Sequence, residues 1–366
     1  MNLSVGLVGL PNAGKSTLFN ALLKKQLAKV AEYPFTTIEP HEGAIDVPDE
    51  RLDRLWEMVK GDPSTKLRMT EQVKTPATVT FIDIAGLVKG AHKGEGLGNE
   101  FLGKIREVDA ILQVVRSFED ERAVHTLGTI DPERDIEIVN MELILKDLEI
   151  ASRLGEKEKN PEIKNLLARI KEALNSGKMV KDLVFSPEEK SHLQFLPFLT
   201  GKPMFYVLNI SEKELGSENL KNLEDKDFPA LPAGRLVVCA KMESDLIELD
   251  FSEQKEYLSS AGVQSCSLEK VIKESFEILD LITFFTIKGG KEVRAWPTKK
   301  GTTAYEAAGL VHTDMQKGFI KAEVINYVDF VKIDNWHKGH EMGKIRLEGH
   351  DYILQDGDII EFKFKV

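Results

Sequence analysis

Short apolar runs recur along the chain, and they show no alternation of polar and apolar positions. The runs are Leu3–Val8, Thr78–Ile82, Ala110–Val115, Met204–Leu208 and Leu236–Cys239. Strands of this kind need burial on both faces, as in a parallel sheet that helices cover on both sides. Segments with helical or loop character separate the runs, so the pattern predicts an α/β domain with a mostly parallel sheet.

The spacing of these predicted strands breaks once, between the third and the fourth run. Apolar positions there recur at steps of three and four residues, first over residues 136–154 and again over residues 163–174. This period is typical of two amphipathic helices. Gly155 is expected to end the first helix, while Asn160 caps the second and Pro161 begins it. The segment therefore predicts an α-helical coiled-coil hairpin inserted into the sheet domain.

The pattern changes again past residue 280. ITFFTIKGGKEVRAWPTKK predicts a β-hairpin with Gly289 and Gly290 at its turn, and Thr302 or Thr303 then opens a short helix. The final run DYILQDGDIIEFKFKV contains two strand-like stretches on either side of Asp356. We expect a small, separate domain of mixed α/β type at the C-terminus.

A chain of 366 residues is too long for one compact core. Residues 1–122 and 201–282 are predicted to form the two parts of the sheet domain. Residues 123–200 would form the helical insertion between them, and residues 283–366 the C-terminal domain.

Composition narrows the class of protein. The apolar content of 42% and the charged content of 30% are those of a globular protein, and a net charge of -11 argues against general attraction to nucleic acid or anionic membranes. Cys239 and Cys266 provide neither a disulfide framework nor a closely spaced metal-binding pair. With no basic leader and no apolar run of membrane-spanning length, the expected location is the cytoplasm.

The strongest motif is GLPNAGKST, residues 9–17, between the first predicted strand and a helix. It fits the P-loop pattern, in which backbone N–H groups of the glycine-rich loop surround phosphate oxygens. Lys15 would reach the β- and γ-phosphates, and Ser16 would bind Mg²⁺. The neighbouring loop residues are expected to contact nucleotide: Asn12, Ala13, Gly14 and Thr17.

A second phosphate element follows in TVTFIDIAG. Asp83 at the end of this strand would hold Mg²⁺ through water, and the N–H of Gly86 would sense the γ-phosphate. The preceding loop YPFTTIEP offers Thr36 and Thr37 as further metal ligands. We favour Thr37.

GLPNAGKST, FTTIEP, DIAGLVKGAHKGEGLGNEFL and VCAKMESDL together resemble the Obg-related GTPases, and specifically their YchF branch, the Obg-like ATPases. The resemblance extends over essentially the whole chain. It implies a G-domain-like P-loop NTPase fold with a coiled-coil insertion and a C-terminal β-grasp-like TGS domain. It also implies hydrolysis of ATP in preference to GTP, and association with ribosomes.

The segment NISE stands where GTPases carry a base-reading NKxD loop. Asn209 is kept, Ile210 replaces the lysine and Glu212 replaces the guanine-binding aspartate. Asn209 could pair with adenine through its amide, and the backbone of Ala240 or Lys241 would lie near the base. These changes point to ATP, although a shifted Glu212 could still restore a guanine contact.

Hydrolysis lacks its usual water-binding glutamine, because Leu87 follows the DxxG motif. His92, Gln113, Asn12 and a partner protein acting in trans remain candidates for holding the attacking water. Gln113 stands where the family carries a histidine, and a buried structural glutamine is an equal alternative. Asn12 lies where related GTPases bind K⁺, which makes K⁺ a second candidate cofactor. Slow ATP turnover is expected.

The predicted partners follow from the same features. Lysines and arginines surround Trp296 in the C-terminal domain and could face RNA, although a solvated basic face is equally consistent. The resemblance favours contact with the ribosome, through its large subunit or the whole particle, and a monomeric protein away from membranes. A GTPase of the Obg type and a nucleotide-gated adaptor with incidental hydrolysis remain the alternatives.

Overall fold

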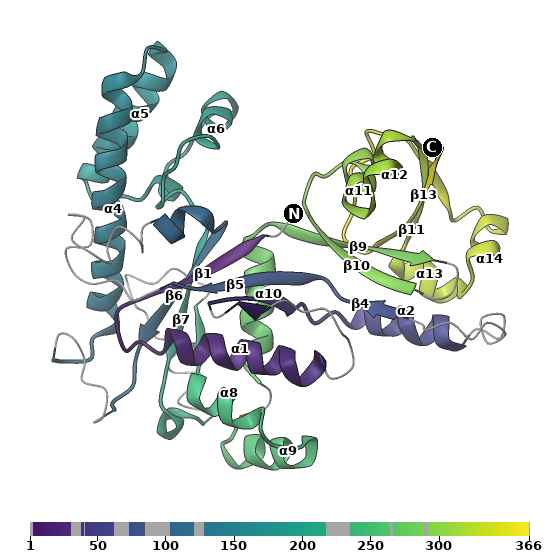
Figure 1. Cartoon of the computed structure of the whole chain (residues 1–366), viewed down its shortest axis with the longest axis horizontal. Coiled ribbons are helices and arrows are strands. Elements are labelled where there is room, and N and C mark those ends of the chain that lie inside the picture. Colours follow the sequence, from purple (N-terminus) through teal and green to yellow (C-terminus); the bar gives the residue numbers. More distant parts are fainter. Residues whose placement is uncertain are drawn as a thin grey trace. The chain divides into compact units, whose positions relative to one another are not determined.

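The computed structural model describes residues 3–30, 38–39, 41–61, 73–84, 103–120, 128–216, 235–263, 266–288 and 292–365. The chain divides into two compact units (Figure 1). The larger unit contains residues 3–45 and 80–271, and the smaller unit contains residues 46–79 and 272–366. Each unit has its own sheet.

A seven-stranded sheet forms the centre of the larger unit, in the order β2-β3-β5-β1-β6-β7-β8. The five strands from β5 to β8 run parallel, which confirms the α/β prediction. All five apolar runs of the sequence are strands of this sheet. The strand bounds are β1 (Ser4–Val8), β2 (Ile38–Glu39), β3 (Glu42–Asp46), β5 (Thr78–Asp83), β6 (Ala110–Arg116), β7 (Met204–Asn209) and β8 (Leu236–Val238).

Helices cover the sheet and bury its apolar strands. They include α1 (Lys15–Val30), α8 (Ala240–Leu246) and α9 (Phe251–Ser260). The helix α10 (Leu268–Ile278) contains residues of both units, because the division falls after Val271. Ile111 and Val115 of β6 share a buried cluster with Ile136 and Val139 of the long helix α4 (Pro132–Lys157). Burial on this scale supplies most of the favourable free energy of folding, at about 25 cal/mol per Å² of apolar surface.

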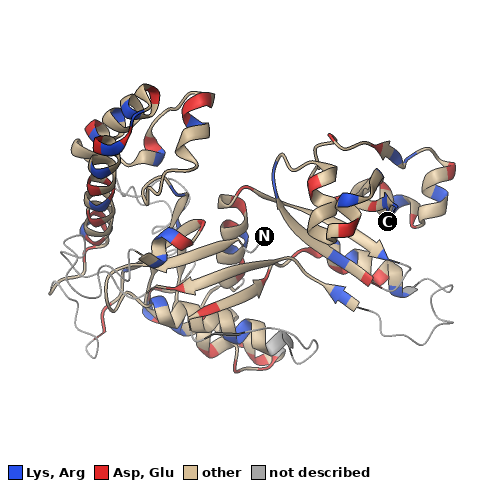
Figure 2. Cartoon of the chain, turned by 45° about the horizontal axis from the view of Figure 1, so that its top comes forward, with Lys and Arg blue, Asp and Glu red and all other residues tan. Residues whose placement is uncertain are grey.

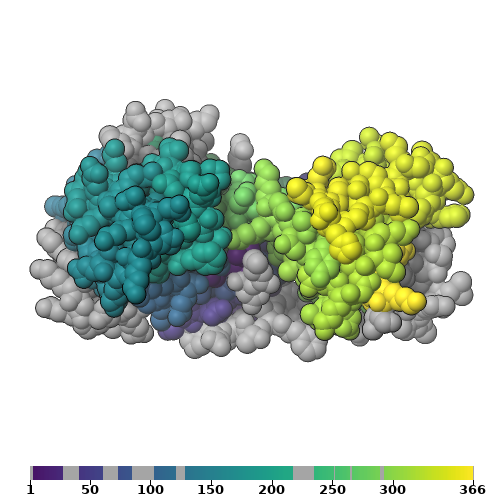
Figure 3. All heavy atoms as spheres, turned by 90° about the horizontal axis from the view of Figure 1, so that it is seen from above, coloured from purple at the N-terminus to yellow at the C-terminus, as the bar shows by residue number. Residues whose placement is uncertain are grey.

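The helical insertion consists of α4, α5 (Pro161–Asn175), η2 (Val180–Asp182) and α6 (Pro187–Leu193). Figure 3 shows its residues in teal as one contiguous body. As predicted, the Asn160 side chain caps α5 by accepting from the Glu162 N–H, and Pro161 occupies the first turn. The predicted end of the first helix at Gly155 is wrong, because α4 continues to Lys157 before the chain turns.

A buried carboxylate fastens α4 to the segment that returns to the sheet. Asp147 is fully buried and accepts hydrogen bonds from the Leu199 N–H at 2.9 Å and the Thr200 N–H at 2.7 Å. It also accepts from the Thr200 hydroxyl at 2.6 Å. Burial raises the pKa of Asp147, and these three hydrogen bonds oppose the shift. The insertion is therefore tied to the strand β7 that follows it.

The smaller unit contains a six-stranded sheet in the order β12-β11-β13-β9-β10-β4. β9 and β10 form the predicted hairpin, and β13 returns parallel to β9 between β9 and β11. This central parallel pair between antiparallel neighbours is a β-grasp-like arrangement. The strand bounds are β4 (Val73–Thr75), β9 (Leu281–Lys288), β10 (Glu292–Lys299), β11 (Phe319–Asn326), β12 (Arg346–Glu348) and β13 (Asp358–Phe364).

Short helices connect and cover these strands. They are α11 (Ala304–Val311), α12 (Thr313–Lys317), α13 (Tyr327–Ile333) and α14 (Trp336–Glu341). Thr303 caps α11 in a capping box with Glu306. Of the two threonines that the sequence offered, Thr302 and Thr303, the second therefore opens the helix. The last strand-like run of the sequence is β13, whereas the run before Asp356 makes only an isolated bridge between Ile353 and Thr303.

Residues 46–79 belong to the smaller unit, although they lie early in the sequence. They contribute β4, which pairs parallel to β10, and α2 (Glu50–Gly61). Arg51 of α2 donates to Asp356 at 2.6 Å, and its guanidinium lies 5.4 Å from the ring centre of Phe285. The domain boundaries taken from the sequence remain a prediction.

Acidic and basic residues are interspersed along the helices of the insertion (Figure 2). Within the described part of the chain, no helix has both the length and the apolar character needed to cross a membrane.

We expect Asp147→Ala to lower the free energy of unfolding by about 3 kcal/mol, because it leaves two buried N–H groups and a hydroxyl without their acceptor. Urea denaturation followed by circular dichroism measures the change. Glu149→Ala on the same helix is the control, since this carboxylate is 48% exposed and makes only a surface ion pair. Equal midpoints for the two variants would contradict the fastening role of Asp147.

Candidate functional site

The loop between β1 and α1 has the backbone geometry of a phosphate-binding loop. Asn12 and Gly14 have positive φ angles of 64° and 92°. A Cβ atom at Gly14 would lie 2.1 Å from the Asn209 Nδ2 atom, and one at Gly9 would lie 2.3 Å from the Val114 carbonyl oxygen. Both glycines are therefore required by close approach as well as by backbone conformation.

Lys15 lies in the first turn of α1 and is only 7% exposed. Its ammonium group donates to the carbonyl oxygens of Gly9 at 3.2 Å and Leu10 at 3.0 Å. Burial lowers the pKa of Lys15 to about 8, while the charge of Asp83 raises it. The loop thus holds a buried cation that an incoming anion would stabilise.

Asp83 ends β5, directly beside β1, where Leu7 is its neighbour in register. The residue is 9% exposed, and its Oδ1 atom is buried with no hydrogen-bond partner among the described residues. Burying a carboxylate oxygen without a partner costs folding free energy unless a cation or a water molecule binds to it. Ser16 is exposed in the first turn of α1, so these two oxygen donors could hold a hard divalent metal ion.

Asn209 ends β7 and is 5% exposed. Its Nδ2 donates to the Ala13 carbonyl oxygen at 3.0 Å, and its Oδ1 accepts from the Ala240 N–H at 3.0 Å. The amide therefore joins the phosphate loop to the loop after β8. The amide keeps a second N–H and a second oxygen lone pair, so its direct pairing with adenine stays a prediction.

The other residues of the base-reading segment lie in contrasting environments. Ile210 is 2% exposed and packs in the core of the larger unit, so it does not take the surface position of a lysine. Glu212 lies in η3 (Glu212–Glu214), with one carboxylate oxygen 3.5 Å from the Lys241 ammonium nitrogen. The Ala240 N–H is already bound to Asn209. Of these four residues, Glu212 and Lys241 are the ones with exposed side-chain surface.

Gln113 lies on β6 opposite Val8, the last residue before the phosphate loop. It is 1% exposed, and its Oε1 atom is buried and finds no hydrogen-bond partner in the part of the chain that the structure describes. The residue is thus close in the sheet to the phosphate loop but enclosed. Three predicted site residues, Thr37, Gly86 and His92, lie outside the described residues, as does Leu87.

The aromatic ring proposed to stack on RNA is partly covered by its own unit. The Trp296 indole N–H donates to the Thr286 hydroxyl at 2.9 Å, and the Arg294 guanidinium lies 3.9 Å from the ring centre. Phe284 is stacked parallel to the indole at 6.2 Å. A base arriving here would meet the guanidinium of Arg294 rather than a bare indole.

The helix α8 is held to residues 266–267 by a buried carboxylate that the sequence did not indicate. Glu243 of α8 is fully buried and accepts hydrogen bonds from the Ser267 N–H and the Cys266 thiol. Burial raises the pKa of Glu243. Its position in VCAKMESDL gives no local signal of this role, because its partners lie more than twenty residues later in the chain.

A glycine-rich loop, its buried lysine and a carboxylate at the end of the neighbouring parallel strand define a P-loop nucleoside triphosphatase. The comparisons agree: a family model described as "50S ribosome-binding GTPase" matches residues 4–153. A second, YchF-GTPase_C, described as "Protein of unknown function (DUF933)", matches residues 281–365. The chain belongs to the YchF family.

Relatives along the full length support this membership. Proteins named "Ribosome-binding ATPase YchF" from Bacillus subtilis and Escherichia coli O157:H7 are 43% and 44% identical to this chain, and each comparison covers 100% of both proteins. The structure of the Schizosaccharomyces pombe YchF GTPase has a TM-score of 0.84 and 34% identity. It covers 99% of this chain and 98% of that chain, which confirms the predicted family and fold class.

We expect Gly14→Ala to weaken nucleotide binding by roughly tenfold or more, because the added methyl group clashes with Asn209 at a positive φ angle. Titration with a fluorescent nucleotide measures the change. The control is Gly155→Ala in α4, where a Cβ meets nothing within 4 Å. That variant should gain about 1 kcal/mol of stability and bind nucleotide normally. Unchanged binding by Gly14→Ala would disprove the close packing of Asn209 against the loop.

Proposed function

We propose that the protein is a nucleotide-dependent switch that binds and slowly hydrolyses ATP and associates with the ribosome. The observation that carries the nucleotide assignment is the base loop, in which Ile210 is buried and Glu212 is paired with Lys241. The names of the relatives, "Ribosome-binding ATPase YchF", support both parts of the proposal.

Recognition of guanine needs a carboxylate that accepts from its N1–H and 2-amino groups. The Glu212 carboxylate forms an ion pair with Lys241. In this position the carboxylate would be a poorer acceptor for the N1–H and 2-amino groups of guanine. Adenine has neither an N1–H nor a 2-amino group, so its binding does not depend on a carboxylate at this position. A hydrogen bond to a charged group contributes about 1.5 to 3 kcal/mol, which corresponds to roughly tenfold to a hundredfold in discrimination.

Phosphate binding rests on the phosphate loop and its cation. Lys15 would exchange the carbonyl oxygens of Gly9 and Leu10 for the β- and γ-phosphate oxygens. Backbone N–H groups from Asn12 to Thr17, at the N-terminus of α1, would surround the remaining oxygens. Asn209 would act by holding Ala13 and Ala240 in place.

Ser16 and Asp83 fit a Mg²⁺ site, with Thr37 as a further proposed ligand. Mg²⁺, when bound, neutralises the charge that develops on the phosphate oxygens. Asn12 is the proposed residue for K⁺. Gly86 would sense the γ-phosphate through its N–H.

The attacking water is proposed to be oriented by Gln113, with His92 as the second candidate residue. Gln113 has both a donor and an acceptor, and its Oε1 atom has no hydrogen-bond partner within the described ranges of the chain. Because this side chain is enclosed, it would reach the site only after a local rearrangement. We therefore propose slow intrinsic turnover, which an activator acting in trans could raise.

The remaining proposals concern partners and location. A cytoplasmic monomer that contacts the ribosome, with RNA contacts from the smaller unit, accords with the relatives' names and with the cations near Trp296. A GTPase and an adaptor with incidental hydrolysis are the competing functions. The next experiment distinguishes a GTPase from an ATPase.

Calorimetric titration with Mg²⁺-bound non-hydrolysable ATP and GTP analogues tests the nucleotide. We expect ATP to bind at least about tenfold more tightly, and Glu212→Asp to narrow the difference by restoring a shorter carboxylate. Glu256→Asp on the exposed face of α9 is the matched control. Tighter GTP binding by the unmodified protein would establish the GTPase alternative. Ile210→Lys is avoided because it would place a charge in the core.

Gln113→Leu tests the catalytic proposal. We expect single-turnover ATP hydrolysis to slow by about tenfold or more. Stability should rise by about 1 kcal/mol, because an unsatisfied buried oxygen is removed. Gln113→His keeps a donor and an acceptor and should retain most of the rate. A Gln113→Leu protein that hydrolyses ATP at the normal rate would assign Gln113 a purely structural role.

A further inference from the structure

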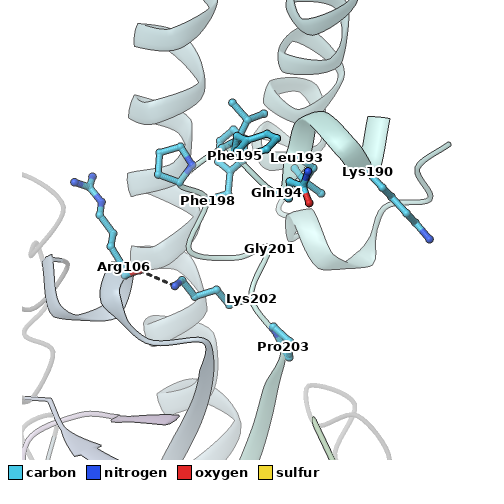
Figure 4. Close-up of a pocket in the computed structure, with 11 residues that line it drawn as sticks. Arg106, Lys190, Leu193, Gln194, Phe195, Phe198, Gly201, Lys202 and Pro203 are labelled. Atoms are coloured by element: carbon cyan, nitrogen blue, oxygen red, sulfur yellow. Dashed lines mark hydrogen bonds between the residues drawn. The ribbon is translucent and has the colours of Figure 1, made fainter. Parts of the chain in front are cut away.

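A pocket of about 510 Å³ lies in the larger unit (Figure 4). It forms where α6 and the chain leading into β7 meet the helical residues 103–107. Its volume is typical of sites that hold a ligand or a side chain of a partner. None of the proposed nucleotide-binding residues is among the described residues that line it.

The apolar part of the pocket comes from the end of the insertion. Phe198 is 4% exposed and belongs to the insertion core, whereas Phe195 is 81% exposed. Phe195 lies in a hydrogen-bonded turn after α6. Its N–H donates to the His192 carbonyl oxygen at 3.2 Å, and the Leu196 N–H donates to the Leu193 carbonyl oxygen at 3.0 Å. The turn therefore presents a large apolar side chain to solvent, a feature typical of binding surfaces.

The charged part of the pocket is entirely basic. Arg106, Lys190 and Lys202 are among the described lining residues, and none of these lining residues is acidic. The chain as a whole has the opposite balance, with 60 acidic and 49 basic residues. Such a local reversal of charge favours an anionic ligand.

The three cations have different roles. Lys202 donates to the carbonyl oxygens of Arg106, at 2.8 Å, and Val108, so it fixes the wall of the pocket at the end of the helical residues 103–107. Burial lowers the pKa of Lys202. Arg106 and Lys190 are exposed and lie on opposite sides of the pocket in Figure 4. They supply the charge at its rim.

We propose that this pocket docks a short acidic peptide segment of a partner protein, with one large apolar side chain placed against Phe195. Carboxylates before and after that side chain would pair with Arg106 and Lys190. Single-stranded nucleic acid needs a basic groove that follows its backbone. Two cations separated by apolar surface suit a peptide better. The proposal is independent of which nucleotide the protein binds.

Fluorescence anisotropy with the full-length protein tests the proposal. The probe is a short dye-labelled peptide in which Asp and Glu flank one central Phe. The control peptide has Ser in place of that Phe. We expect saturable binding of the first peptide that weakens by at least about tenfold in Phe195→Ser. The double variant Arg106→Gln, Lys190→Gln should bind more weakly and lose most of the salt dependence.

Two matched variants control for general surface effects. Val184→Ser removes an apolar side chain that is 92% exposed in the insertion, and Lys171→Gln removes an exposed charge of α5. Neither residue lines the pocket, so both variants should bind the peptide normally. Nucleotide titration of all variants should be unchanged, which separates a failure of the docking proposal from a failure of the proposed function.

Three results would overturn the proposal: no saturable binding of the acidic peptide, equal binding of the Ser-substituted peptide, or equal binding by Phe195→Ser. Oligouridine is titrated in parallel. Binding of oligouridine that exceeds peptide binding and is lost in the same pocket variants would assign the pocket to nucleic acid instead.

Discussion

The side-chain amide of Asn209 joins two loops of the proposed nucleotide site. The phosphate loop follows β1 and the segment that begins at Cys239 follows β8. The strands β6 and β7 separate β1 from β8 in the sheet. No backbone ladder can therefore connect the loops directly. One buried amide does so, by donating to Ala13 and accepting from Ala240. The absence of a side chain at Gly14 follows from this contact, since a methyl group would occupy the space of the amide.

A second constraint acts through a single long helix. α4 contributes Ile136 and Leu143 to the core beneath the sheet, and Ile150 and Ala151 to the core of the insertion. The two cores are thus connected by continuous helical backbone, and Asp147 lies between these two sets of contacts. Tilting the insertion would require breaking the hydrogen bonds of a buried carboxylate, so this junction resists independent motion.

The sequence predicted those parts of the fold whose signals are local. Five apolar runs, the P-loop and the cap at Asn160 all depend on neighbouring residues, and all appear where expected. The end of α4 was misplaced because glycine in a helix is a weak stop signal when packing favours continuation. The burial of Ile210 and the pairing of Glu212 with Lys241 could not be predicted, since they depend on contacts between distant segments.

The chain passes between its two units at residues 45/46, 79/80 and 271/272. An early segment of the chain therefore contributes α2 and β4 to the smaller unit. The other strands of that unit's sheet come from the C-terminal part of the polypeptide. A truncation before residue 281 would leave Arg51 without Asp356 and β4 without β10. The C-terminal strands therefore share one folding unit with residues 46–79, and we expect a chain without them to expose apolar residues of α2 such as Leu52 and Leu55.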